Sequence, residues 1–150
     1  MGLVLDCSVT LPWFLEDERT PFTDSLLLAA KGAEYWVPGI WCLEFPNALL
    51  VAQRKRRIER PRRIEALEQV PTLQMRIDGE PVDLLAVSAV AEKHELSTYD
   101  AAYLELAMRR GLGLATLDRD LADAAAAEGV AVHSPGSRPG VQQKRRRYNI

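Results

Sequence analysis

The sequence predicts an α/β fold in which helices cover both faces of a central, mostly parallel sheet. Short apolar runs alternate along the chain with longer segments of helical periodicity, as in repeated strand–helix–strand units. The 150 residues suffice for one domain with a buried core. A composition of 47% hydrophobic and 27% charged residues is typical of a globular protein.

The first four elements follow from apolar runs and from the prolines and glycines that bound them. Residues 3–6 are apolar and too few for a helix, so they predict a buried strand. A proline near its start predicts a helix over residues 12–18, and a second helix over 21–32 closes at its terminal glycine. Residues 34–38 are rich in strand formers and stop at a proline, which predicts the second strand.

The rest of the chain continues this alternation. Helical periodicity predicts helices over about 40–57 and 61–69, and residues 75–78 fit a third strand. The last five elements are delimited by prolines, glycines and capping residues: helices over 81–96, 97–111 and 118–129, and strands over 113–117 and 130–134.

The end of the chain differs in composition from the rest. Residues 135–150 have no periodicity and are rich in proline, glycine and bases, including the run KRRR at 144–147. We therefore expect one domain over residues 1–134 and a basic, flexible tail over 135–150.

The N-terminal segment and the use of cysteine predict a cytoplasmic protein. The N-terminal segment lacks the basic region of a signal peptide, and no apolar run approaches the roughly 20 residues that span a bilayer. Cys7 and Cys42 are the only cysteines, and neither has the spacing of a zinc site. We expect two reduced thiols that serve as small core side chains.

Charge is unevenly distributed although the net charge is only −2. Residues 1–50 hold seven acids and two bases, whereas residues 54–63 hold seven bases and one acid. The simpler interpretation of the basic stripe is a solvated face. A polyanionic partner is the other interpretation that it permits.

Four acids occupy positions where a ligand site forms in parallel sheets. Asp6 and Asp118 each follow a predicted strand, and ligands bind beyond the carboxyl ends of such strands. Glu44 and Asp100 stand near the starts of predicted helices. Each acid has a capping role as its simpler explanation. A capping acid does not need the apolar side of its helix, however, and Asp100 falls on that side.

Carboxylates brought together repel one another unless a cation lies between them. An oxygen-rich site without histidine or cysteine suits Mg²⁺ or Mn²⁺, which activate water and hold phosphate oxygens in phosphodiester hydrolysis. Ser8 and Thr116 each stand two residues from a proposed ligand. We expect these hydroxyls to help orient the attacking water.

Four segments resemble the PIN domains of VapC-type toxins. They are LVLDCS (3–8), VPGIWCLEFPNAL (37–49), LSTYDAAYLELA (96–107) and LATLDRDL (114–121), and their order and spacing match the family over about residues 3–133. The resemblance implies a three-layer α/β/α PIN-like fold. It also implies a Mg²⁺- or Mn²⁺-dependent endoribonuclease of a type II toxin–antitoxin system, which leaves a 5′-phosphate and a 3′-hydroxyl. The implied partners are RNA, a cognate VapB-type antitoxin and a second copy of the chain.

The resemblance also assigns site residues. The catalytic, metal-binding acids of the family correspond to Asp6, Glu44, Asp100 and Asp118, with Asp120 as a further acid of the TxDxD motif. The accessory polar positions correspond to Ser8, Asn47 and Thr116. One departure from the family pattern is Pro46, which disfavours helical backbone at Phe45. We expect the helix either to start or to bend at Pro46. Either outcome affects the direction in which the Glu44 side chain points.

Further residues are candidates for contact with partners. Arg54, Lys55, Arg56 and Arg57 would supply sequence-independent contacts to the RNA backbone. Trp13, Phe14 and Trp41 either line a groove for the antitoxin or a second copy, or pack in the core, which is the simpler explanation for each.

Other protein classes also use an Asp after the first strand of such a sheet. A haloacid-dehalogenase phosphatase needs a second Asp where this chain has Ser8, and a response-regulator receiver needs a Lys where Pro135 follows the last strand. Both alternatives are therefore disfavoured. A non-catalytic PIN-like module that binds RNA or a partner stays open, although retention of all four acids argues against it.

Overall fold

The computed structural model describes residues 2–136, which contain one parallel sheet of five strands. The strands lie in the order β3-β2-β1-β4-β5. Their bounds are β1 Leu3–Leu5, β2 Tyr35–Val37, β3 Arg76–Ile77, β4 Gly113–Ala115 and β5 Val132–His133. Each of the four neighbouring pairs is parallel, which confirms the predicted sheet. The expected tail lies almost wholly outside the described residues.

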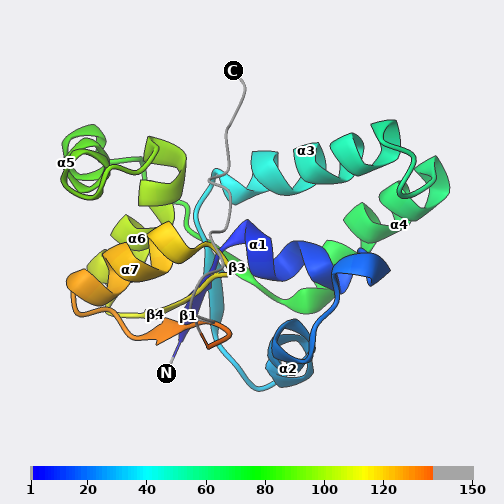
Figure 1. Ribbon diagram of the computed structural model, residues 1–150, viewed down its shortest axis with the longest axis horizontal. Helices are drawn as coiled ribbons and strands as arrows, with labels where there is room; N and C mark the ends of the chain where they lie inside the picture. The colour runs from blue at the N-terminus through cyan, green and yellow to red at the C-terminus, as the bar shows by residue number, and fades with distance from the viewer. Residues whose placement is uncertain (1, 137–150) are drawn as a thin grey trace.

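Helices cover both faces of the sheet, and this confirms the predicted three-layer α/β/α architecture. Figure 1 shows α1 to α4 on one side of the strands and α5 to α7 on the other. The first group comprises α1 Cys7–Thr10, α2 Pro21–Ala29, α3 Trp41–Arg54 and α4 Arg60–Gln69. The second comprises α5 Leu84–His94, α6 Thr98–Arg110 and α7 Arg119–Ala127. No helix in residues 2–136 is long and apolar enough to cross a membrane.

The strand order has a topological switch point between β1 and β4. The chain leaves β1 toward β2 on one side and leaves β4 toward β5 on the other, so the segments that follow these two strands diverge. Such a point opens a crevice at the carboxyl edge of a parallel sheet. The segments beginning at Asp6 and Thr116 lie there, directly after β1 and β4.

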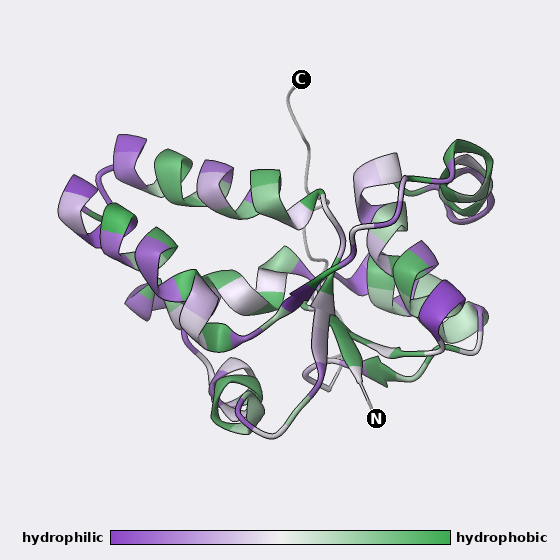
Figure 2. Ribbon diagram, turned by 180° about the vertical axis from the view of Figure 1, so that it is seen from behind, coloured by the Kyte–Doolittle hydropathy of each residue, from purple (hydrophilic) through white to green (hydrophobic). Residues whose placement is uncertain are grey.

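The core lies between the sheet and the two helical layers. Figure 2 shows hydrophobic residues along the central strands and alternating hydrophobic and hydrophilic residues along the outer helices. The three aromatic candidates Trp13, Phe14 and Trp41 are buried, as core packing requires. Trp41 stacks on Phe45 with ring centroids 4.7 Å apart, and the indole N–H of Trp41 donates to Thr10 Oγ1 at 3.0 Å. This contact fixes the start of α3 against α1.

The segment after β1 differs from the helix expected over residues 12–18. Helix α1 begins directly after Asp6, and two 3₁₀ turns follow it, η1 Leu11–Trp13 and η2 Glu16–Glu18. The extended backbone of Leu15 separates the two turns and prevents a continuous helix. The early start of α1 brings Ser8 back toward the end of β1, which the expected helix would not have done.

The start of α5 also differs from expectation, whereas that of α3 does not. Helix α5 begins at Leu84 and not at Pro81, because Asp83 caps it by accepting the Ala86 N–H at 3.0 Å. Helix α3 begins at Trp41, close to the start of the helix predicted over about 40–57, and it continues through Pro46, which excludes the alternative of a start at Pro46. Its first turn forms upstream, where Glu44 N donates to Ile40 O at 2.9 Å.

Pro46 therefore lies inside α3. A proline cannot donate to the carbonyl four residues earlier, which here is that of Cys42. Cys42 is exposed, so water can reach this end of the helix. The predicted core position of Cys42 is wrong for the same reason, since this part of the first turn faces solvent, whereas Cys7 is buried as predicted.

Candidate functional site

Asp6 is a buried carboxylate held by two hydroxyl groups. It follows β1 directly and is 1% exposed. Ser8 Oγ and Thr116 Oγ1 both donate to Asp6 Oδ2, at 2.5 Å and 2.9 Å. Asp6 N also donates to Ala115 O at 3.0 Å, so the backbone at this point is paired with β4. Burying a carboxylate without donors is costly, and these hydroxyls supply them.

The same two hydroxyls accept backbone N–H groups from the segment after β4. Leu117 N donates to Ser8 Oγ and Asp118 N donates to Thr116 Oγ1, each at 2.9 Å. Each hydroxyl therefore accepts one hydrogen bond from a backbone N–H and donates one to Asp6. Ser8 and Thr116, predicted as residues that orient water, are in the structure the residues that orient Asp6.

Asp118 combines a helix cap with a position near other acids. Its Oδ1 accepts the Leu121 N–H at 3.2 Å at the start of α7, which confirms the capping explanation. Burial raises the pKa of Asp118, and the negative charges of Asp6 and Asp120 raise it further, although backbone hydrogen bonds oppose the change. Asp118, Asp6 and Asp120 thus act on one another electrostatically.

Glu44 reaches the interior from the first turn of α3. It is 8% exposed, and the Tyr103 hydroxyl donates to Glu44 Oε1 at 2.8 Å. Burial raises the pKa of Tyr103 well above its ordinary value, with further increases from the charges of Asp6 and Glu44. Tyr103 therefore stays protonated as a donor and lies within electrostatic reach of two of the acids.

Asp100 lies on the buried side of α6, as the helical periodicity predicted, and is 7% exposed. Ser97 caps the helix by accepting the Asp100 N–H at 3.1 Å. Asp100 and Tyr103 are three residues apart and therefore share one face of α6. The sequence indicated only a core position for Tyr103, and its spacing from Asp100 was the available sign of a further role.

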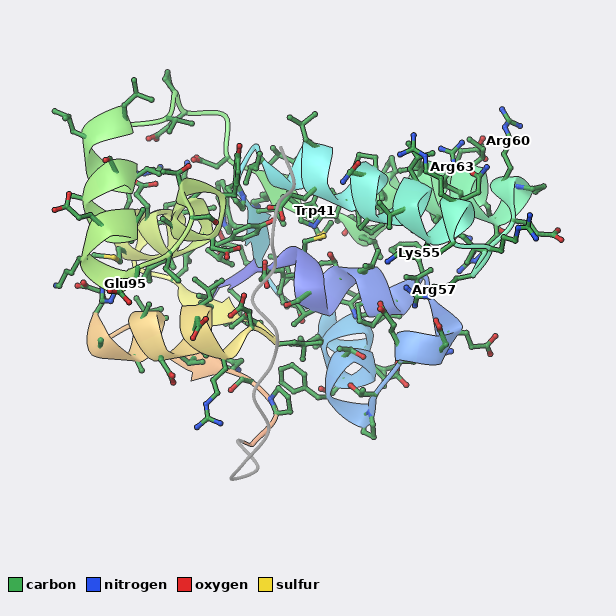
Figure 3. The ribbon with its side chains drawn as sticks, turned by 45° about the horizontal axis from the view of Figure 1, so that its top comes forward. Trp41, Lys55, Arg57, Arg60, Arg63 and Glu95 are labelled. Atoms are coloured by element: carbon green, nitrogen blue, oxygen red, sulfur yellow. The ribbon has the colours of Figure 1, made fainter. Side chains whose placement is uncertain are left out.

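The other predicted residues lie around this cluster or away from it. Asp120 is half-buried in the first turn of α7, and Asn47 is exposed on α3, three residues beyond Glu44. Arg54 lies ten positions after Glu44, which is a distance of roughly 15 Å along α3. Figure 3 shows Lys55, Arg57, Arg60 and Arg63 at that far end, away from Trp41.

The basic stripe is not uniform. Arg54, Lys55 and Arg56 are exposed, whereas Arg57 forms ion pairs with Asp17 at 2.9 Å and with Glu18 at 3.2 Å. Arg57, one of the four predicted RNA contacts, is thus already engaged by the acidic turn η2. All four residues are exposed, and no ion pair with Arg54, Lys55 or Arg56 is seen in residues 2–136.

Within residues 2–136, no three Asp, Glu, His or Cys side chains already stand at the spacing that encloses a metal ion. The interactions above nevertheless connect the acids. Asp6, Asp118 and Asp120 are coupled by charge, and Tyr103 contacts Glu44 and feels the charge of Asp6. These interactions link the segment after β1, the segment after β4, α3 and α6.

Comparison with family models matches residues 3–127 to the PIN domain. The crystal structure of PAE2754 from Pyrobaculum aerophilum has 23% identity and a TM-score of 0.68, covering 88% of this chain and 89% of that one. VapBC2 from Rickettsia felis, bound to a DNA fragment from its promoter, has 12% identity and a TM-score of 0.67, covering 91% and 100%.

A third similar structure is FitAcB from Neisseria gonorrhoeae, with 17% identity and a TM-score of 0.61, covering 87% of this chain and 95% of that one. At these identities the three structures show a shared fold. The comparison with curated protein sequences found no match.

The raised pKa of Asp118 predicts the effect of Asp118→Asn on stability. Asparagine keeps the cap on Leu121 and removes the charge that Asp6 and Asp120 repel. The free energy of unfolding of the variant at pH 7 should therefore equal or exceed that of the wild type. Because the folded pKa lies above the ordinary 3.8, the folded wild type binds the proton more tightly, and the difference should shrink as pH falls toward that value.

Urea denaturation in EDTA checks this expectation. Asp118→Ala is the control, because it removes both charge and cap and should lose about 1 kcal/mol through the cap. A clear loss of stability in Asp118→Asn at pH 7 would show that the acid stabilises the fold and is not under repulsion.

Proposed function

The chain belongs to the PIN-domain family, and we propose that it is a metal-dependent endoribonuclease toxin of a type II toxin–antitoxin system. The observation that carries the proposal is the position of Asp6 and Asp118 after the adjacent parallel strands β1 and β4, where a crevice opens in such a sheet. We assign Glu44 and Asp100, in the first turns of α3 and α6, to the same site.

The donor set fits a hard divalent cation. The proposed ligands Asp6, Glu44, Asp100 and Asp118, with Asp120 beside them, offer only oxygen atoms, which Mg²⁺ and Mn²⁺ prefer. A bound cation would relieve the repulsion that the charges of Asp6 and Asp120 exert on Asp118. When bound, the cation neutralises phosphate charge and lowers the pKa of water.

The residues of the chain have separable roles in this proposal. Ser8 and Thr116 hold one oxygen of Asp6 in place, which fixes the carboxylate plane at the end of β1. The negative cluster repels an RNA backbone unless its charge is compensated, so substrate entry depends on the cation. Hydrolysis leaves a 5′-phosphate and a 3′-hydroxyl, as the family resemblance implies.

Contacts to RNA outside the cluster fall to the exposed part of the basic stripe. Arg54, Lys55 and Arg56 are available to phosphates, and their charges carry no sequence information. Arg57 is engaged with Asp17 and Glu18 and makes a smaller contribution. The protein would act in the cytoplasm, where its RNA substrate is found.

The proposed protein partners are a VapB-type antitoxin and a second copy of the chain. Support comes from the structural likeness to VapBC2 and FitAcB and from apolar side chains left in solvent. Val82, Leu84 and Leu85 are 65%, 78% and 85% exposed where α5 begins. An apolar group of this kind favours association between proteins.

Replacement of Asp100 by Asn should abolish metal-dependent cleavage of RNA. The change keeps the shape of the side chain and removes the charge that would bind the cation, so cleavage of a structured RNA in Mg²⁺ or Mn²⁺ should fall by at least about a hundredfold. Asp123→Asn, on the exposed side of α7, is the matched control and should retain activity.

EDTA should stop the wild-type reaction in the same assay. Equal cleavage by Asp100→Asn and the wild type would remove Asp100 from the site. RNA binding without any cleavage in Mg²⁺ or Mn²⁺ would instead indicate a non-catalytic binding module.

Neutralising the exposed stripe should weaken RNA binding without regard to sequence. The changes Arg54→Gln and Lys55→Gln are made in an Asp100→Asn background. They should reduce the slope of the logarithm of the binding constant against the logarithm of salt concentration by about 0.7 for each phosphate that the protein no longer neutralises. Fluorescence anisotropy of labelled single-stranded RNA measures this slope. Lys31→Gln, an exposed base beyond α2, is the control, and equal slopes in both variants would exclude the stripe.

Two lysines at the start of α5 should separate the proposed dimer. Sedimentation velocity at micromolar concentration should give twice the chain mass for the wild type and the monomer mass for the double variant Leu84→Lys and Leu85→Lys. Leu28→Lys, at an equally exposed leucine on α2, should leave the dimer intact. A monomeric wild type would contradict the proposal.

A further inference from the structure

Tyr103 joins two elements that carry proposed metal ligands. It lies on α6, its side chain is fully buried, and its hydroxyl donates to Glu44 Oε1 on α3 at 2.8 Å. The two residues are 59 positions apart in sequence, and their helices cover opposite faces of the sheet. The hydrogen bond therefore links the two helical layers.

Glu44 needs such an anchor more than the aspartates do. Its side chain has one more rotatable bond than aspartate, and it stands in the first turn of α3, two residues before Pro46. The proline removes one hydrogen bond from this turn, so the backbone alone holds Glu44 less firmly than in an unbroken helix. A donor from a well-packed helix fixes the carboxylate where the local helix does not.

Helix α6 is suited to supply that donor. Ser97 caps its start, and Gly111, in the left-handed region with φ of 64°, ends it. Asp100 and Tyr103 lie one turn apart on its buried face. The rigid helix thus sets the position of one proposed ligand directly and that of Glu44 through the phenol.

We propose that Tyr103 is a positioning residue of the metal site, holding the Glu44 carboxylate in the orientation that binds the divalent cation. The inference rests on the proposed function, because it assigns Glu44 to that cation. The bond holds Oε1 in place and so restricts rotation of the carboxylate. Loss of the hydroxyl would let Glu44 rotate and would weaken cation binding while leaving the packing of the ring unchanged.

The chain offers a matched control for a merely structural role. Tyr35 is also buried, and its hydroxyl donates to the backbone carbonyl of Leu26 at 2.7 Å. Tyr35→Phe and Tyr103→Phe each remove one oxygen atom and one buried hydrogen bond. Only Tyr103 contacts a proposed ligand.

Binding of Mn²⁺ to the purified protein, followed by the electron paramagnetic resonance of free Mn²⁺, tests the proposal. Tyr103→Phe should bind about tenfold more weakly than the wild type, as is usual when a partner of a metal ligand is removed. Tyr35→Phe should stay within about twofold. An unchanged affinity in Tyr103→Phe, or an equal loss in both variants, would overturn the positioning role.

Two further measurements keep the result specific. In a Glu44→Gln background, Tyr103→Phe should cause no additional loss of Mn²⁺ affinity, because the phenol acts through Glu44. In wild-type protein with ¹³C-labelled tyrosine, the Tyr103 resonance should shift on titration with Mg²⁺ while that of Tyr35 stays fixed. Additive losses, or a Tyr103 signal that does not respond to Mg²⁺, would count against the proposal even if Tyr103→Phe folds poorly.

The outcomes also separate this inference from the proposed function. A wild type that binds no Mn²⁺ overturns both. A wild type that binds Mn²⁺ and cleaves RNA, with Tyr103→Phe unaffected, overturns only the role of Tyr103.

Discussion

The structure depends on holding the Asp6 carboxylate in the interior. A charged group at 1% exposure destabilises a fold unless hydrogen bonds replace the water that it loses. Ser8 and Thr116 provide these bonds, and each can do so because a backbone N–H from the segment after β4 occupies its acceptor side. The cost of burying one charge thus defines how the ends of β1 and β4 are arranged relative to each other.

Acids that we propose as metal ligands also belong to helix starts of the fold. Asp118 caps α7 and is under repulsion from Asp6 and Asp120, and Asp100 lies in the first turn of a helix that Ser97 caps. Capping and ligand roles are therefore compatible, because helix starts are places where acids are favourable in any case. Burial and nearby negative charge raise the pKa of Asp118, and shifts of this kind are typical of functional sites.

The sequence predicted most of the sheet and the positions of Asp6 and Asp118 after β1 and β4, because both follow from local patterns. Strands show as short apolar runs, and an acid directly after a strand lies at the carboxyl edge. The start of α1 and the exposure of Cys42 were not predictable, since they depend on tertiary contacts such as that of Trp41 with Thr10. Tyr103 was missed because a buried tyrosine on an apolar face looks the same whether its hydroxyl meets a carbonyl or a carboxylate.

The common face of Asp100 and Tyr103 on α6 limits how this sequence can evolve. Substitutions elsewhere on the helix leave both side chains in place, but one inserted or deleted residue between Ser97 and Asp100 turns the face by about 100°. Both groups would then leave the edge of the sheet at once. The segment should accordingly tolerate changes of residue far better than changes of length, whereas the exposed stretch 79–83, which contains no helix or strand, can absorb insertions.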